Sequence, residues 1–152
     1  MQYNKFTFKM YNENMLSQLL LRLLPSKPVF AHCDIPCGIY DPHSAQLAAK
    51  TVLTMVQKIK ELDDNLNDRN NFVRMVHVKE EHAEICKREI LILWTDYFKA
   101  EHLEKCPDLH DLIWKSAKLC SDNKRAVDES KAQELVESVD KIAEIFNQSK
   151  AK

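Results

Sequence analysis

The chain has 152 residues, of which 45% are hydrophobic and 30% charged, and its formal net charge is -1. This length and composition are typical of one globular domain, and the near-neutral charge gives no basic signature for nucleic-acid binding. One glycine is too few for the turns of a β-rich fold, and no apolar run reaches the roughly 20 residues of a membrane span. The sequence therefore predicts an all-α protein with no membrane segment.

Residues 1–31 have the composition of a removable leader. They carry four basic side chains against one acidic side chain, and their apolar patch spans residues 15–24. The segment ends in a small residue, Ala31, directly before His32, which is similar to the cleavage site of a secretory signal. Arg22 inside the apolar patch favours two alternatives, an amphipathic helix that stays attached or a pro-segment that is cut inside the cell.

The chemistry of the chain is concentrated in residues 32–40, His-Cys-Asp-Ile-Pro-Cys-Gly-Ile-Tyr. This segment holds two of the five cysteines and the only glycine. We expect it to form a compact hook with soft metal ligands inside it. The predicted organisation is therefore a leader at 1–31, followed by one domain at 32–152 that begins with this hook.

Four amphipathic helices are predicted after the hook, at about residues 42–66, 70–99, 107–119 and 128–148. Asp41 is suited to cap the first helix, and Pro42 suits its first turn. Short polar links at 65–68 and 121–123 favour an antiparallel four-helix bundle.

Each helix has an expected core stripe. The stripe of the first is Leu47, Val52, Val56, Ile59, Leu62 and Leu66, and that of the second is Val73, Val76, Ala83, Cys86, Ile90, Leu93 or Trp94, and Tyr97. The third has Leu109, Leu112, Ile113 and Trp114, and the fourth has Ala132, Leu135, Val139, Ile142 and Phe146. Cys86, Cys106 and Cys120 lie in or beside these stripes and are expected to be buried or half-buried thiols.

Several kinds of site compete for the hook. Thiolates are soft ligands, and imidazole suits zinc, copper, nickel and iron. Structural zinc needs two further ligands beside Cys33 and Cys37, and Cys106 with His110 has a suitable separation. Di-iron bundles need Glu-x-x-His pairs and thioredoxin-type proteins need Cys-x-x-Cys, and neither pattern occurs. The odd number of cysteines argues against a fully paired disulfide framework, although a local Cys33–Cys37 disulfide stays open.

Cleavage before His32 would create a nickel site. The new terminus offers a primary amine, which the amide nitrogen and the thiolate of Cys33 extend into consecutive chelate rings around one metal ion. Cys37 can return a second thiolate, and two nitrogens with two sulfurs in a plane suit nickel(II). The imidazole of His32 can then reach an axial position.

The hook and several later segments resemble the nickel-containing superoxide dismutases. The resemblance covers residues 32–40 and continues through Asp41-Pro42. It returns in the segments Leu-Trp-Thr-Asp-Tyr-Phe-Lys at 93–99, His-Leu-Glu-Lys at 102–105 and Pro-Asp-Leu-His at 107–110. Most of the chain after residue 31 is therefore covered, and the last helix is the least diagnostic part.

The resemblance implies an enzyme that disproportionates superoxide to dioxygen and hydrogen peroxide by cycling nickel between +2 and +3. It also implies one nickel ion per chain, a right-handed hook on a four-helix bundle, and a homohexamer. By position, His32 supplies its amine and axial imidazole, Cys33 its amide nitrogen and thiolate, and Cys37 its thiolate. Deprotonated amide and thiolate donors stabilise the higher oxidation state.

The same resemblance assigns roles beside the metal. Tyr40 and Tyr97 match tyrosines that flank the approach of the substrate, although a core aromatic with a bonded hydroxyl is the alternative for Tyr97. Asp34, Pro36 and Gly38 match residues that shape the hook. Only an X-Pro bond adopts the cis form readily, and glycine permits a positive φ or a close backbone approach.

The chain departs from the family pattern around the axial imidazole. Many members place a glutamate and an arginine there, whereas this chain has Ala48 and His82. His82 is a candidate to hold or relay through His32, with a surface histidine as the alternative. Arg74, Lys79 and Lys99 are candidates to steer the superoxide anion.

Two other functions and two locations stay open at this point. A metal-binding or metal-delivery protein would use the same hook without turnover, and a secreted helical protein would close Cys33 and Cys37 into a disulfide. The leader implies a processing protease. Free thiolates fit a reducing compartment, so the cytoplasm is the expected location, with export as the alternative if the leader is a true signal.

Overall fold

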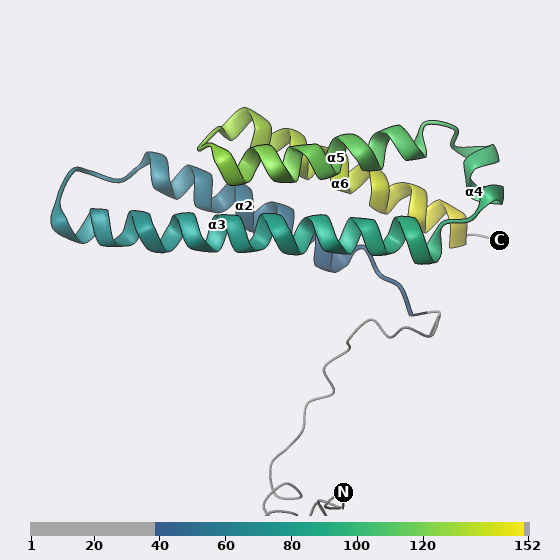
Figure 1. Cartoon of the computed structure of the whole chain (residues 1–152), viewed down its shortest axis with the longest axis horizontal. Coiled ribbons are helices and arrows are strands. Elements are labelled where there is room, and N and C mark those ends of the chain that lie inside the picture. The colour runs from purple at the N-terminus through teal and green to yellow at the C-terminus, as the bar shows by residue number, and fades with distance from the viewer. Residues whose placement is uncertain (1–38, 151–152) are drawn as a thin grey trace, which may run out of the picture. The chain divides into compact units, whose positions relative to one another are not determined.

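The computed structural model describes residues 39–150, which form six helical segments (Figure 1). The four long helices are α2 (His43–Lys60), α3 (Leu66–Ile92), α5 (Leu109–Arg125) and α6 (Glu129–Lys150). Between α3 and α5 lie a π-helix, η1 (Leu93–Tyr97), and the short α4 (Ala100–Lys105). No strand occurs among the described residues.

The long helices form the predicted bundle. Helix α2 packs against α3 and α6, and α5 packs against the same two helices, so α2 and α5 are diagonal partners. The chain reverses direction after α2 and again after α5, and these neighbours run antiparallel (Figure 1). The prediction of an all-α antiparallel four-helix bundle is confirmed for the described residues.

The core is built as predicted in α6 and only partly so elsewhere. All five expected core residues of α6 are buried, namely Ala132, Leu135, Val139, Ile142 and Phe146. In α2 the buried face is made of Ala45, Ala48 and Ala49 together with Val52, Val56 and Ile59. Leu47 is instead 58% exposed, because the small alanines, and not the leucine, face α3 and α6.

Three further core predictions are wrong. Leu66 and Val73 are 83% and 67% exposed, since they lie in the first turns of α3, which precede the level at which α5 ends. Trp114 of α5 is 57% exposed, and the ammonium of Lys118 lies 5.3 Å from the centroid of its ring. An apolar residue on a helical stripe is buried only where a neighbouring helix covers it.

The helix boundaries differ from the prediction at polar residues that bond to backbone. Asn65, predicted to lie in a link, caps α3, because its side-chain oxygen accepts a hydrogen bond from the backbone N–H of Asp68 at 2.9 Å. The predicted second helix ends early, in η1, and α4 was not predicted. The predicted first helix also runs too far, since α2 ends at Lys60.

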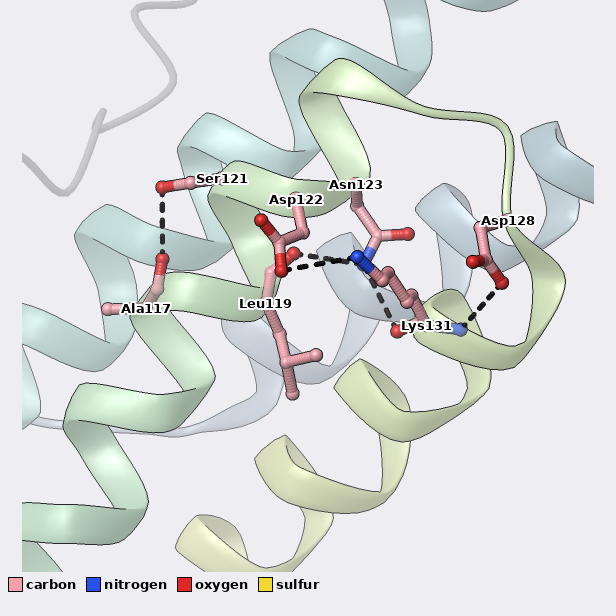
Figure 2. A network of polar contacts seen from close by, with 7 residues as sticks. All are labelled: Ala117, Leu119, Ser121, Asp122, Asn123, Asp128 and Lys131. Atoms are coloured by element: carbon pink, nitrogen blue, oxygen red, sulfur yellow. Dashed lines mark hydrogen bonds and ion pairs between the residues drawn. The ribbon is translucent and has the colours of Figure 1, made fainter.

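The predicted link at 121–123 is in fact the last part of α5. The hydroxyl of Ser121 donates to the carbonyl of Ala117, and the amide of Asn123 donates to the carbonyls of Leu119 and Lys131 at 3.0 and 3.1 Å (Figure 2). These side chains satisfy carbonyls instead of competing with the helix, so α5 continues to Arg125. Asn123 thereby also ties the end of α5 to the start of α6.

A buried lysine holds the same junction from the other side. Lys79 of α3 is 1% exposed, and its ammonium donates to the carbonyls of Asn123, Lys124 and Ala126. Burial lowers the pKa of Lys79. The last carbonyls of a helix have no partner within the helix, and the ammonium supplies one here.

Replacing Lys79 with methionine is expected to lower the free energy of unfolding by about 2 to 3 kcal/mol, because buried carbonyls would be left without donors. Urea unfolding followed by circular dichroism measures this. Lys58→Met is the matched control, since Lys58 is an exposed lysine of α2, and it should change stability by less than about 0.5 kcal/mol. Equal losses in the two variants would contradict the role assigned to Lys79.

The three cysteines after the hook are thiols in the bundle, as expected. Cys86 and Cys120 are fully buried and Cys106 is half-buried. The hydrogen bond between Cys86 and Cys120, followed by burial, raises the pKa of Cys86. A protonated, buried thiol is a poor nucleophile and a poor metal ligand, so these two cysteines belong to the core.

Candidate metal centre and its approach

The predicted metal ligands His32, Cys33 and Cys37 lie outside the described residues, and so do the hook-shaping residues Asp34, Pro36 and Gly38. Their roles therefore stay predictions. The described residues from Ile39 onward show how the chain enters the bundle. Asp41 accepts a hydrogen bond from the backbone N–H of His43 at 2.8 Å, and Pro42 is the N-cap residue of α2. These contacts fix the direction in which the chain enters α2.

The two predicted tyrosines lie side by side, Tyr40 as the last residue of the hook segment and Tyr97 as the last residue of η1. The ring centroids of Tyr40 and Tyr97 are 5.6 Å apart, with their planes at 58°. Tyr97 also packs against Phe146 at 4.5 Å and Phe98 at 5.2 Å, and it stacks on His102 at 5.6 Å with only 7° between the planes. Tyr97 is thus surrounded by aromatic side chains from α4, α6 and the segment after η1.

The π-helix explains where Tyr97 stands. Its wide turn is closed by the backbone N–H of Phe98, which donates to the carbonyl of Leu93 at 2.9 Å. Single π-turns are frequent at functional sites, because they change the direction in which a side chain leaves the helix. The next turn is fixed by His102, whose Nδ1 accepts the backbone N–H of Lys99 at 2.9 Å.

Sequence reasoning missed the polar partners of the two tyrosines. The hydroxyls of Tyr97 and Ser149 are 2.6 Å apart, and the ammonium of Lys150 donates to the carbonyl of Tyr40 at 3.2 Å. That ammonium also lies 4.3 Å from the ring centroid of Phe146. The sequence predicts that the fourth helix ends at about residue 148, whereas α6 continues through Ser149 to Lys150. The sequence does carry one signal for this contact, because Ser149 follows Phe146 at helical spacing and therefore continues the same face of the helix.

The remaining candidates are spread along α3 and at its end. His82 is half-buried, and its Nδ1 lies 2.9 Å from the carbonyl of Val78. Its position along the helix axis is about 22 Å before that of Tyr97, at the rise per residue of an α-helix. Arg74 and Lys99 are exposed, whereas Lys79 is buried at the α5–α6 junction. Two of the three predicted steering cations are therefore open to solvent.

The described residues offer no competing metal site. No group of three His, Cys, Asp or Glu side chains within residues 39–150 is arranged to hold a metal ion. Of the four ligands in the zinc alternative, Cys106 and His110 are described, and Nδ1 of His110 accepts the indole N–H of Trp94 at 2.7 Å. The donor set that suits nickel, with two thiolates, an amine and an amide nitrogen, is the one that the sequence predicts for the hook, whose donors lie outside the described residues.

Within the described part of the chain, no helix is both long enough and apolar enough to cross a bilayer.

Comparisons with known proteins agree on one family. A family model described as nickel-containing superoxide dismutase matches residues 27–150. A protein named superoxide dismutase [Ni] from Streptomyces seoulensis is 36% identical over 137 residues, covering 90% of this chain and 98% of the relative. Its counterpart from Streptomyces coelicolor is 37% identical over the same coverage.

Solved structures show the same likeness. The native structure of a nickel superoxide dismutase at 1.30 Å has a TM-score of 0.71 and 35% identity, covering 78% of this chain and 99% of the other. The structure described as having the nickel ligation of the oxidised state has a TM-score of 0.72 and 35% identity, covering 80% and 100%.

Proposed function

The chain belongs to the nickel-containing superoxide dismutase family, and we propose that residues 32–40 form its nickel hook. Its activity is the disproportionation of superoxide to dioxygen and hydrogen peroxide, with nickel as the cofactor. The observation that carries the assignment is the family match, which begins at residue 27 and so includes every proposed donor of the hook. The alternative of a metal-delivery protein without turnover is not favoured by these comparisons.

In this proposal the ligands come from three residues. His32 gives its amine and imidazole, Cys33 its amide nitrogen and thiolate, and Cys37 its thiolate, while Asp34, Pro36 and Gly38 shape the hook. Bound nickel supplies a one-electron couple between +2 and +3, one ion per chain. Soft sulfur and nitrogen donors fit this metal, whereas hard oxygen donors would favour other ions.

The described residues supply the approach to this site. The ring of Tyr40, the last residue of the hook segment, lies beside the ring of Tyr97. In this proposal the pair limits access to the nickel ion and orders water. Lys99 and Arg74 are exposed cations that can attract an anion despite the net charge of -1. His82 is the candidate to act through His32 in place of the family's usual charged pair.

Assembly and maturation are the finer parts of the proposal. Exposed apolar side chains support a homohexamer, because patches of this kind are typical of surfaces between subunits. They include Leu66, Phe72 and Val73 along the start of α3, with exposed fractions of 83%, 45% and 67%. A leader at residues 1–31, removed by a protease, would free the amine of His32. The thiolates of the hook favour the reducing cytoplasm.

The test is to produce the chain together with its processing protease and to measure intact mass, nickel content and superoxide decay. A mass that starts at His32, about one nickel per chain and rapid decay of superoxide are expected. Native mass spectrometry of the same sample gives the number of subunits. Uncut protein carrying zinc, or cut protein without metal, would contradict the proposal.

A further inference from the structure

The last turn of α6 makes contacts that the family assignment does not explain. It is distant in sequence from the hook, yet the hydroxyl of Ser149 is hydrogen-bonded to the hydroxyl of Tyr97, and the ammonium of Lys150 donates to the carbonyl of Tyr40. Both tyrosines are proposed to flank the approach of superoxide. One short segment therefore touches both of them, and it touches each through a polar group.

The direction of the Tyr97 hydrogen bond follows from the proton count. The hydroxyl of Ser149 donates to the carbonyl of Phe146 at 2.6 Å, and a carbonyl can only accept. The single hydroxyl proton of Ser149 is thereby used, so its oxygen must accept from Tyr97. The phenol proton of Tyr97 consequently points to α6, and the orientation of the ring is set by a helix end.

Lys150 holds Tyr40 through the backbone carbonyl of that tyrosine. Its ammonium lies 3.2 Å from the carbonyl oxygen of Tyr40 and 4.3 Å from the ring centroid of Phe146. Phe146 in turn packs on Tyr97 at 4.5 Å. The lysine therefore links the chain that leaves the hook to the same aromatic cluster that holds Tyr97.

We propose that the last turn of α6 is the positioning element of the substrate approach, with Ser149 orienting Tyr97 and Lys150 anchoring the backbone at Tyr40. Neither residue reacts with superoxide. Each acts through a tyrosine, and its loss should leave that tyrosine in several orientations. This inference rests on the proposed function, because it assigns a purpose to the two tyrosines.

The first test is Ser149→Ala in the processed, nickel-loaded protein. It should lower kcat/KM for superoxide about fivefold, the size expected when one hydrogen bond no longer selects one orientation. Ser149→Thr keeps the hydroxyl and should stay within about twofold of the parent. Gln148→Ala is the matched control, since Gln148 is an exposed neighbour on the same helix, and it should have no effect.

A second readout does not depend on nickel or on activity. In the metal-free chain of residues 1–152, the ring resonances of ¹³C-labelled Tyr97, assigned with Tyr97→Phe, should shift and broaden in Ser149→Ala but not in Gln148→Ala. Unchanged resonances with unchanged kcat/KM would overturn the role of Ser149. If the parent protein shows no dismutase activity, the proposed function fails, while the resonances still decide whether Ser149 holds Tyr97.

Lys150 needs a test that separates anchoring from attraction of the anion. Lys150→Met should lower kcat/KM about fivefold at both low and high salt, and Lys150→Arg should restore it, because a hydrogen bond to a carbonyl persists in salt. A loss that disappears at high salt would mean that the lysine only steers superoxide, and it would overturn the anchoring role.

Discussion

Serine in place of Cys37 is expected to remove nickel binding and superoxide turnover together. The substitution replaces a soft thiolate with a hydroxyl that stays protonated at neutral pH, and nickel in a sulfur and nitrogen site does not accept it. Losing a residue that only supports a ligand costs about tenfold to hundredfold in metal affinity, so losing the ligand itself should cost more than about hundredfold. Nickel content after dialysis and superoxide decay on the same sample measure both effects.

Cys106→Ser is the matched control for this change. Cys106 is a half-buried thiol that directly precedes Pro107, and it is the C-cap residue of α4. The same atom is exchanged, but we expect full nickel content and full activity. Far-ultraviolet circular dichroism should be the same for both variants, because the exchange of one sulfur for one oxygen changes the volume of the side chain little, and Cys106 is only half-buried at the edge of the core. A Cys37→Ser protein that keeps one nickel per chain with the parent's affinity would contradict the proposed ligand set.

Much of the bundle follows from helical periodicity, and its failures have a common physical cause. In α6 the apolar residues recur where α2 and α5 cover them, so all five predicted core positions are buried. Val73 of α3 has the same spacing but no α5 beside it, and it is exposed. Lys79 interrupts the apolar stripe of α3 and is nevertheless buried, because backbone carbonyls at the end of α5 accept hydrogen bonds from its ammonium. A single sequence does not state which neighbour covers a residue.

The candidate site, like the bundle, could be predicted from the sequence only in part. The hook could be identified as a metal segment from adjacent residues alone, since its donors lie within six positions of one another. The pairing of Tyr40 with Tyr97 came from the family resemblance, and the structure brings the two rings together. The contact between Tyr97 and Ser149 joins residues 52 positions apart and depends on the packing of α6, so no local pattern announces it.

Protein that begins at Ala31 is expected to lack the nickel site that we propose for protein beginning at His32. One added residue converts the amine of His32 into an amide, which removes the amine donor. The free amine then belongs to Ala31, one residue further from Cys33, so the chelate rings that include Cys33 no longer begin at an amine. The change is a single alanine, so the bulk of the leader cannot account for the loss. Nickel affinity should fall more than about hundredfold, and superoxide decay should fall to background.

The same hypothesis predicts a pH dependence and a rescue. A metal binds the deprotonated amine, whose ordinary pKa is about 7.7 to 8.0, so nickel affinity of the His32 form should fall as the pH is lowered below about 8. The Ala31 form lacks that donor and should not show this component. An aminopeptidase that removes Ala31 should restore nickel binding and activity in the same sample. Full nickel content and full turnover with Ala31 still attached would mean that the amine is not a ligand, and that removal of residues 1–31 serves another purpose than completing the metal site.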